Sequence, residues 1–542
     1  MIGSMQDWPL LVWKLLDHAA LNHGDREIVT QTVEGPLHRS TWLQVHARAK
    51  RLAQAMSRLG VERGDRVATM AWNTYRHIEC WYAISGMGAV AHTLNPRLFQ
   101  DQIAYIVNHA EDRVLFFDLD LLPIVEAIAP RLDTVRHFVV MTDREHMPDS
   151  RLQLLCYEDL VAAESGEFRW AELDETAPAG LCYTSGTTGE PKGVLYSHRS
   201  NVLHTLGVIG LDALGMASRT VVLPVVPMYH ANAWGIPYAA AAVGAKIVMG
   251  GPRFDPATLH RLMIDEAVTL SAGVPTVWFN LLNYLESHEL DLGRMERAII
   301  GGSAAPRSMI ETLETRYGVT VAHAWGMTEM SPVGTVGVIC AATERESPER
   351  RLDVKCKQGR PLFGVELAIR DDAGRELPRD GSTVGHLTTR GPWVVKHYFK
   401  GDGGTVVDEH SWFDTGDIAA IDQRGYVQIT DRAKDVIKSG GEWISTIALE
   451  NIAVGHPAVA EAAVIGVPHP KWDERPLLLL VRKPGAEISR DEALSYMCGK
   501  IAKWWLPDDV VFVDSLPHTA TGKLQKAALR ERFRGHRLPV ED

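Results

Sequence analysis

A loop rich in glycine and hydroxyl residues is the segment best suited to bind an anion. It reads YTSGTTGEPKG over residues 183–193 and follows an apolar stretch, Ala179–Cys182, that is expected to form a strand. Glycines let backbone N–H groups approach one anion, while the hydroxyls and Lys192 add donors and a positive charge. A run of Gly and Thr alone would favour a plain solvated loop. Lys192 favours polyphosphate binding, although the spacing is not that of a Walker A motif.

The sequence on both sides of this loop alternates between helical and strand patterns, and the elements that they predict must position the loop. Apolar residues at helical spacing from Val45 to Leu59 predict a helix, with Thr41 and Gln44 as its capping box. Further strands are expected at Val67–Ala71, Val114–Phe117, Phe138–Met141, Val221–Val226 and Lys246–Met249, and further helices at Pro256–Asp265 and Ser308–Tyr317. This alternation predicts an α/β fold of several layers and sheets.

The composition changes near residue 430, where a charged segment with a Ser-Gly-Gly turn covers residues 431–442. Beyond it we expect a small α+β unit, with strands at Ala462–Val467, Leu477–Val481 and Val510–Val513 and helices around Glu492–Trp505 and Leu524–Phe533. We therefore predict a large N-terminal domain over residues 1–431 and a smaller, mobile C-terminal domain over residues 432–542. The charged, glycine-bearing boundary is suited to a hinge.

The overall composition argues against several classes of protein. The 542 residues are 46% hydrophobic and 23% charged, as in ordinary globular proteins, and the net charge of −12 argues against a nucleic-acid partner. We find no apolar run of membrane-spanning length and no signal peptide. The six cysteines form no C-x-x-C pair. We expect a cytoplasmic enzyme whose cysteines are small buried hydrophobic residues.

Seven ordered motifs resemble those of one family, the adenylate-forming acyl-CoA synthetases, whose superfamily includes luciferases and peptide-synthetase adenylation domains. After the loop at 184–193 come MYH at 228–230, GGSA at 301–304, WGMTE at 325–329, WFDTGD at 412–417, DRAKD at 431–435 and TGK at 521–523. The resemblance spans residues 183–523. It implies a large N-terminal domain, a small mobile C-terminal domain and ATP bound between them.

The resemblance also implies which residues bind the nucleotide and its metal. Asp417 and Arg432 would contact the ribose, and Glu329, assisted by Thr184, would coordinate Mg²⁺, a cation that prefers hard oxygen ligands. Taken alone, Asp417 would more often cap a turn and Glu329 could be a solvated carboxylate. The other ATP and AMP contacts would be Thr184, Ser185, Gly186, Thr187, Thr188, Gly189, Lys192, Gly302, Ser303, Ala304, His323, Ala324, Trp325, Gly326, Met327 and Thr328.

Lys523 resembles the lysine that the family uses for adenylation. A positioned ammonium stabilises the negative charge that develops when a carboxylate attacks the α-phosphorus of ATP. The resemblance also makes His230 a group that approaches the phosphates and gives Tyr229 and His230 a gating role at the acyl entrance. A lone histidine at such a strand end would more often be a satisfied structural group.

A second set of residues is expected to act after pyrophosphate leaves. In the family the C-terminal domain turns at a hinge, here Lys434 with Asp435, and brings a new loop to the site. Lys438 is expected to be catalytic, and the residues expected to meet coenzyme A are Gly440, Gly441, Glu442, Trp443 and Glu474. The alternatives are ordinary loop charge for Lys434 and a core role for Trp443.

The acyl pocket is expected to be lined by Tyr229, Trp234, Gly235, Gly302, Met327 and Pro332. No charged residue in these motifs would recognise a second polar group, so a short, unadorned acyl chain fits best. The segments 323–332 and 439–445 resemble bacterial 3-methylmercaptopropionate-CoA ligases of dimethylsulfoniopropionate demethylation, a branch near short- and medium-chain fatty acyl-CoA ligases. Sulfur–aromatic packing is worth only ~0.3–1.5 kcal/mol, too little to exclude an alkyl chain.

The expected reaction has two steps. A carboxylate and ATP give acyl-AMP and pyrophosphate, and coenzyme A then gives acyl-CoA and AMP, with Mg²⁺ as the metal. We expect 3-methylmercaptopropionate to be the preferred acid. The alternatives are a short- or medium-chain fatty acyl-CoA ligase, an adenylating enzyme that loads a carrier protein, and a non-catalytic nucleotide-binding protein. Family members are often dimers, so a homodimer is also expected.

Overall fold

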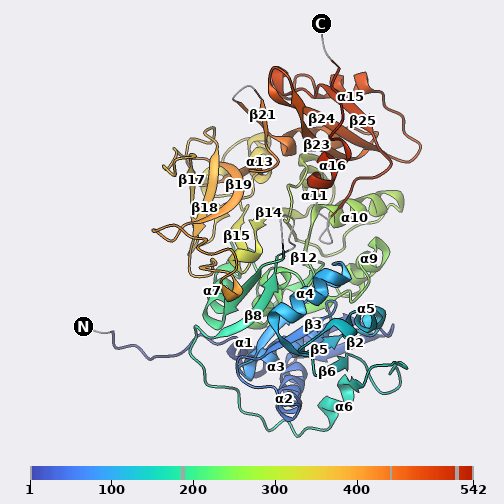
Figure 1. The fold of residues 1–542 in the computed structure, drawn as a ribbon, viewed down its shortest axis with the longest axis vertical. Helices are drawn as coiled ribbons and strands as arrows, with labels where there is room; N and C mark the ends of the chain where they lie inside the picture. Colours follow the sequence, from blue (N-terminus) through green and yellow to red (C-terminus); the bar gives the residue numbers. More distant parts are fainter. Residues whose placement is uncertain (1–2, 185–189, 440–441, 519–523, 540–542) are drawn as a thin grey trace.

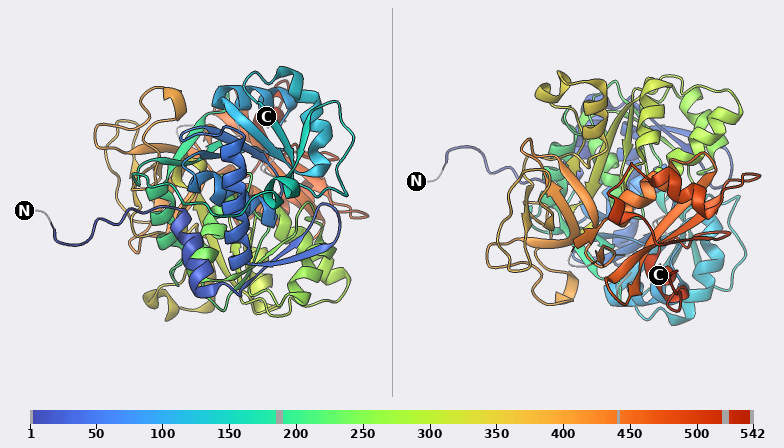
Figure 2. Two further views of the ribbon diagram at one scale, coloured as in Figure 1. Left: turned by 90° about the horizontal axis from the view of Figure 1, so that it is seen from below. Right: turned by 90° about the horizontal axis from the view of Figure 1, so that it is seen from above.

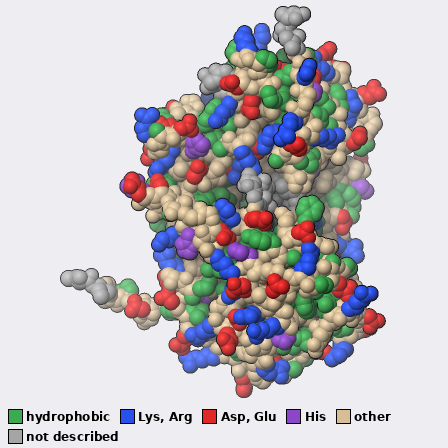
Figure 3. All heavy atoms as spheres, in the orientation of Figure 1, with side chains coloured by type: hydrophobic (Ala, Val, Ile, Leu, Met, Phe, Trp, Pro, Cys, Tyr) green, Lys and Arg blue, Asp and Glu red, His purple; other side chains and the backbone are tan. Residues whose placement is uncertain are grey.

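The computed structural model of the protein describes residues 3–184, 190–439, 442–518 and 524–539. Within these ranges the strands form four sheets, with helices packed on and between them (Figure 1). The sheets of the first 430 residues and the C-terminal sheet are seen from two further directions in Figure 2. Basic and acidic side chains are interspersed over the face seen in Figure 3. No helix in the described ranges combines the length and apolar character needed to cross a bilayer.

A seven-stranded sheet is built from the first 200 residues of the chain. Its order is β7 (Leu154–Cys156), β6 (His137–Val140), β5 (Asp112–Phe117), β3 (Arg66–Met70), β4 (Val90–Thr93), β8 (Pro178–Tyr183) and β9 (Gly193–Ser197). The pairings from β7 to β8 are parallel, and β8 and β9 form an antiparallel pair. The parallel strands are mostly buried, which explains their continuous apolar runs.

A nine-stranded sheet carries most of the remaining motifs. Its order is β16 (Arg360–Pro361), β15 (Val333–Val336), β14 (Thr320–Gly326), β13 (Arg297–Ile300), β12 (Leu270–Gly273), β10 (Val221–Pro224), β11 (Lys246–Met249), β1 (Glu27–Gln31) and β2 (Leu37–Thr41). The strands from β1 to β13 pair in parallel, and the outer strands at both ends add antiparallel pairs. Strand β14 starts in parallel with β13 and continues antiparallel to β15.

Helices fill the space around these two sheets. Every residue of helix α3 (Tyr75–Gly86) is buried, and it packs against α2 (Trp42–Arg58), β4 and β8. The other helices of this region are α1 (Trp13–His23), α4 (Gln100–Ala110), α5 (Leu122–Ile128), α6 (Tyr157–Ala162), α7 (His198–Val208), α8 (Ile236–Val243), α9 (Pro256–Asp265), α10 (Pro275–Ser287), α11 (Arg307–Thr315), α12 (Ala341–Glu344) and α13 (Pro348–Lys355). Short 3₁₀ segments are η1 (Leu119–Leu121), η2 (Ala129–Arg131), η3 (Ala231–Gly235), η4 (Thr328–Met330) and η5 (Phe399–Gly401).

Two smaller sheets follow. An antiparallel sheet contains β17 (Glu366–Arg370), β18 (Gly385–Arg390), β19 (Phe413–Ile421) and β20 (Val427–Arg432). The C-terminal sheet has the order β22 (Glu442–Ile444), β21 (Ile437–Ser439), β24 (Asp473–Arg482) and β23 (Val459–His469), with β25 (Asp509–Phe512) parallel to β24. It is covered by α14 (Thr446–Val454), α15 (Arg490–Met497), η6 (Lys503–Trp505) and α16 (Lys526–Arg532). The chain passes between the two sheets through residues 433–436.

Several elements lie where the sequence patterns predicted them. The helix expected from Val45 to Leu59 is α2, and the side chain of Thr41 accepts a hydrogen bond from the backbone N–H of Gln44. The helix predicted at residues 256–265 agrees with α9 at both ends, and Asp255 caps its first turn. These boundaries were predictable because local caps fix them.

Two local expectations are wrong. The helix predicted around Glu492–Trp505 ends at Met497, because the following chain turns through Gly499 at a φ of 78° and only a short 3₁₀ segment covers residues 503–505. The cysteines are also not uniformly buried, since Cys498 is exposed while Cys80, Cys156 and Cys182 are buried. All six are free thiols.

Candidate active site

Four of the predicted motifs follow the carboxyl ends of strands in the two large sheets. Thr184 follows β8, Tyr229 lies just beyond β10, Gly301 follows β13, and Met327 follows β14. In open α/β sheets, ligands bind in the crevice beyond the carboxyl ends of parallel strands. The topology therefore gathers segments that lie far apart in the sequence at one edge of each large sheet.

The glycine-rich loop is closed at its base by its own ends. The backbone N–H of Thr184 donates to the carbonyl of Lys192 over 2.9 Å, and the N–H of Lys192 donates to the Thr184 hydroxyl over 3.2 Å. Strands β8 and β9 continue this pairing as a hairpin. The remaining predicted loop contacts, Ser185, Gly186, Thr187, Thr188 and Gly189, lie outside the described residues.

Glu329 lies on the 3₁₀ turn η4 and its side chain is almost completely buried. Its Oε1 accepts a hydrogen bond from the hydroxyl of Tyr398 over 2.8 Å. The backbone around it is also fixed, because the hydroxyl of Tyr196 donates to the carbonyl of Thr328 over 2.7 Å. Burial, together with the charge of Glu329, raises the pKa of Tyr398 well above its usual value, so the tyrosine stays a proton donor.

Asp417 lies inside strand β19, directly after Gly416, whose φ is 69°. Its Oδ2 accepts from the indole N–H of Trp325 over 2.8 Å, and its Oδ1 lies 2.9 Å from Nε of Arg432. Asp417 and Arg432 are register partners across β19 and β20, whose ladder shifts between Ile418 and Ala419. Three predicted nucleotide contacts are thus brought together, with Asp417 buried and Arg432 partly exposed.

The buried side chain of His323 forms a hydrogen bond with the segment at residues 301–305. Its Nδ1 lies 3.1 Å from the carbonyl of Cys356, and its Nε2 accepts from the backbone N–H of Ala305 over 3.3 Å. Burial lowers the pKa of His323 to about 4, so the ring is neutral and carries its proton on Nδ1. Both ring nitrogens are therefore used by the protein, while Gly302 and Ser303 are exposed on the outer side of the segment.

The acyl-pocket candidates Trp234 and Gly235 belong to a left-handed turn. Residues 231–235 all have positive φ, between 43° and 75°, and four of them are not glycine. Gly235 is required here, because a Cβ at this position would lie 2.7 Å from the ring of His204. The indole of Trp234 packs over Gly301, where an added Cβ would lie 3.1 Å from the ring. Strained backbone conformations of this kind cluster at functional sites.

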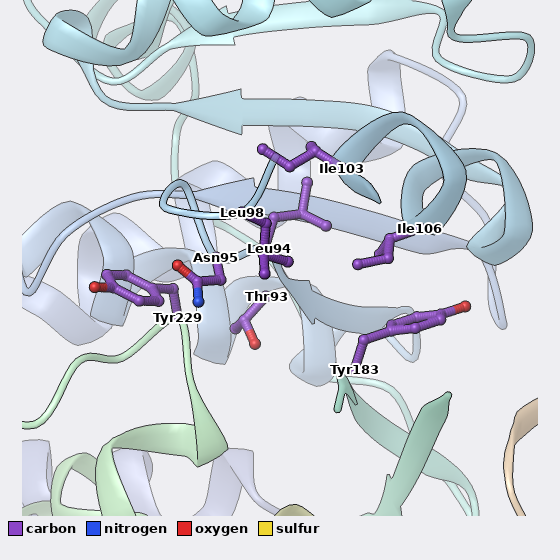
Figure 4. A pocket seen from close by; sticks show the side chains of 8 residues that line it. All are labelled: Thr93, Leu94, Asn95, Leu98, Ile103, Ile106, Tyr183 and Tyr229. Atoms are coloured by element: carbon purple, nitrogen blue, oxygen red, sulfur yellow. The ribbon is translucent and has the colours of Figure 1, made fainter. Parts of the chain in front are cut away.

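Met327 and Pro332 are joined by a backbone hydrogen bond, since the N–H of Met327 donates to the carbonyl of Pro332 over 2.9 Å. Tyr229 instead faces the seven-stranded sheet, where its ring meets Trp72 edge-on at 5.8 Å. Figure 4 shows Tyr229 beside Thr93 and Asn95 at one end of a cavity of about 10 Å³. That volume suits a single water molecule and not an acyl chain.

The C-terminal candidates lie around the hairpin β21–β22. The backbone N–H of Lys438 donates to the Glu474 carboxylate over 3.2 Å, and Ser439 pairs with Asp473. The ring of Trp443 meets His386 of β18 edge-on at 6.3 Å. Lys434 occupies an exposed turn that precedes this hairpin. Gly440, Gly441 and Lys523 lie outside the described residues, as does the side chain of Glu442.

Two residues at the site were not predicted from the sequence. Tyr398 holds Glu329, and the fully buried Asn73 fixes the strand end before Tyr229 and His230. The Asn73 amide donates to the carbonyls of Pro224 and Val226 over 2.9 Å and accepts from the N–H of Met228 over 2.7 Å. An asparagine three residues after the apolar strand at 66–70 was a signal available for Asn73, whereas Tyr398 stands in none of the motifs identified above.

Two family models match the chain. The AMP-binding enzyme model matches residues 16–399, and the model of the AMP-binding enzyme C-terminal domain matches residues 448–523. The crystal structure of ATP-bound MatB from Rhodopseudomonas palustris superposes with a TM-score of 0.83 at 27% identity, covering 97% of this chain and 99% of that one. These matches confirm the predicted fold class of a large N-terminal α/β domain with a small C-terminal domain.

Two relatives are similar along the whole chain. The chain is 50% identical over 535 residues to the 3-methylmercaptopropionyl-CoA ligase of Ruegeria lacuscaerulensis, covering 98% of this chain and 99% of the relative. It is 47% identical over 534 residues to the medium-chain-fatty-acid–CoA ligase of Ectopseudomonas oleovorans, covering 98% of both chains.

Proposed function

Because the chain belongs to the AMP-binding enzyme family and is an AMP-forming acyl-CoA ligase, we propose that it activates a short carboxylic acid, with 3-methylmercaptopropionate preferred. The observation that supports this proposal is that Lys192 and Glu329 both contact Tyr398, while Asp417 accepts a hydrogen bond from Trp325 in the same motif as Glu329. The 50% identity to a 3-methylmercaptopropionyl-CoA ligase supports the choice of acid.

In the proposed first step, one carboxylate oxygen of the acid attacks the α-phosphorus of ATP. The bond to the oxygen that bridges to the β-phosphate breaks, and pyrophosphate leaves with that electron pair. The paired Asp417 and Arg432 would orient the ribose, and Lys192 would meet the phosphates. Lys523 would stabilise the charge that builds up on the phosphorus oxygens.

Glu329 fits the role of magnesium ligand. It is a buried carboxylate with Oε1 engaged by a neutral hydroxyl, and Thr184 lies at the base of the predicted phosphate loop. Mg²⁺ usually takes one or two protein carboxylates together with substrate phosphates and water. When bound, the ion would neutralise phosphate charge, and the residues named here would hold and orient it.

In the proposed second step, the thiol of coenzyme A loses its proton to solvent and its sulfur attacks the acyl carbon. The bond from that carbon to the phosphate oxygen breaks, and AMP leaves with the electron pair. The hairpin β21–β22 would be turned toward the site about Lys434 and Asp435. Its Lys438 is exposed, and the neighbouring Lys471 and Trp472 form a cation–π pair at 4.6 Å. An exposed cationic and aromatic surface of this kind suits the phosphates and adenine of coenzyme A.

A panel of acids tests the proposed substrate. Purified protein with ATP, Mg²⁺ and coenzyme A would be given 3-methylmercaptopropionate and straight-chain acids from acetate to decanoate, and kcat/KM would be ranked from thioester formation. We expect 3-methylmercaptopropionate to rank first. A maximum at hexanoate or longer acids would instead establish a medium-chain ligase, the second candidate, which the 47% identity to such an enzyme favours. One methylene is worth roughly 1–3 kcal/mol, so the ranking should be resolvable.

Replacing Asp417 with asparagine is expected to raise the KM for ATP roughly tenfold or more, because a hydrogen bond to a charged group is worth ~1.5–3 kcal/mol. The carbonyl oxygen of the new amide would still accept from Trp325, which limits damage to the fold. The matched control is Asp414→Asn, an exposed carboxylate on the same strand. An unchanged KM for ATP in a variant with parental thermal stability would contradict the ribose role.

Replacing Lys434 with proline is expected to spare acyl-AMP synthesis and slow thioester formation, because proline fixes φ at the proposed hinge. The two half-reactions are measured separately, from pyrophosphate release and from acyl-AMP plus coenzyme A. Lys434→Ala removes the charge without fixing φ and serves as the control. Equal losses in both half-reactions would reject a hinge at this residue.

A further inference from the structure

Tyr398 joins two groups that the proposed function assigns to different parts of the nucleotide complex. Its hydroxyl donates to Oε1 of Glu329 over 2.8 Å, and both residues are 8% exposed. The ammonium of Lys192 lies 5.1 Å from the centre of the same ring. One tyrosine therefore contacts the proposed magnesium ligand through its hydroxyl and the proposed phosphate lysine through its π face.

The Lys192 ammonium packs closely against the backbone at Gly403. A Cβ added at Gly403 would lie 2.7 Å from Nζ of Lys192, so the small residue leaves just enough room for the cation. In the ranges that the structure describes, no ion pair joins Lys192 to Glu329, and each contacts Tyr398 instead. A direct ion pair would neutralise the charges of Lys192 and Glu329 against each other. The ring of Tyr398 instead gives the Lys192 ammonium a weaker cation–π partner.

Tyr398 is fixed by protein contacts that need no ligand. Its ring belongs to a small buried cluster with Cys182, Val194 and Tyr196, from the strands on both sides of the glycine-rich loop. The segment that follows it is tied to the end of α4 by the ion pair of Lys400 with Glu111 at 2.6 Å. The ring is thus held in place before any nucleotide arrives.

We propose that Tyr398 is a positioning residue that keeps Glu329 and Lys192 apart and correctly placed, so that one remains available to the metal and the other to the polyphosphate. The inference rests on the proposed function, because it assigns metal and phosphate roles to those two side chains. Partners of metal ligands of this kind typically change metal affinity when they are removed.

The test is a binding titration with the full-length protein. Mn²⁺ binding in the presence of a non-hydrolysable ATP analogue would be followed by electron paramagnetic resonance, and kcat and KM for MgATP would be measured in parallel. Tyr398→Phe keeps the ring and loses the hydroxyl, and we expect roughly 10–100-fold weaker Mn²⁺ binding. Tyr398→Leu also removes the ring beside Lys192, so the KM for MgATP should rise above that of Tyr398→Phe. Tyr284→Phe on α10 is the control and should match the parent.

Two reference variants separate this inference from the proposed function. Glu329→Gln should weaken Mn²⁺ binding by itself, and adding Tyr398→Phe to it should cost little more, because the two groups act as a unit. Parental Mn²⁺ affinity in Glu329→Gln would overturn the proposed metal site. A weakened Glu329→Gln together with parental Tyr398→Phe would overturn the positioning role alone.

Discussion

Replacing Lys523 with alanine is expected to slow acyl-adenylate formation by roughly 10²–10³-fold, the usual cost of removing one donor aimed at transition-state charge. The expectation follows from the family motif at residues 521–523 and from the chemistry of the step, in which charge accumulates on the α-phosphate. Since the lysine acts on the transition state and not on bound ATP, kcat should fall far more than the affinity for ATP.

The half-reactions make this prediction specific. Acyl-AMP formation would be followed in single-turnover experiments, and thioester formation would be started from synthetic acyl-AMP and coenzyme A. Only the first should be impaired in Lys523→Ala. Lys500→Ala, an exposed lysine of the same domain, is the control. If acyl-AMP formed at the parental rate in Lys523→Ala, the adenylation role would be disproved.

Replacing Lys526 with methionine is expected to destabilise the C-terminal region by about 3–5 kcal/mol, the usual cost of breaking a buried ion pair by removing one partner. Lys526 is buried at the start of α16, with Nζ 2.8 Å from Oε1 of Glu450 and in contact with the hydroxyl of Thr446. Thr446 in turn donates its N–H to Asp431 over 2.7 Å. Without the lysine, two buried carboxylates would face each other.

The loss should depend on pH. Burial, with a smaller contribution from the charge of Asp431, raises the pKa of Glu450 to about 7 despite the opposing charge of Lys526. Because the folded pKa lies above the unfolded value near 4.3, the native state binds the extra proton, and Glu450 costs stability as pH rises through about 7. Removing Lys526 should strengthen this trend, so Lys526→Met should lose more stability at about pH 8 than at about pH 5.5.

Urea unfolding at the two pH values measures this effect. The double variant Lys526→Met with Glu450→Gln should recover part of the lost free energy of unfolding, because it removes one uncompensated carboxylate. Lys500→Met is the matched surface control. A loss that is equal at both pH values, with no recovery in the double variant, would mean that packing and not charge explains the effect.

Features of the site could be predicted from the sequence where residues close together in the chain define them, and not where they depend on distant partners. The base of the glycine-rich loop and helix α9 were predictable, because strands and caps adjacent in sequence define them. The placement of Asp417 was not, because its position inside a strand depends on a ladder irregularity with β20. Tyr398 and Asn73 were missed because their partners lie 69 and up to 155 residues away, and only the folded sheets bring them together.

The left-handed turn at residues 231–235 has an energetic consequence for any molecule that binds against it. A left-handed conformation costs roughly 1–2 kcal/mol for most residues other than glycine and less for asparagine, and this turn contains Ala231, Ala233 and Trp234 besides Asn232. The sum is a sizeable fraction of the roughly 5–15 kcal/mol that keeps a typical domain folded. The turn thus stores conformational strain energy. A ligand whose binding lets the turn adopt a less strained conformation would gain part of that energy as binding free energy.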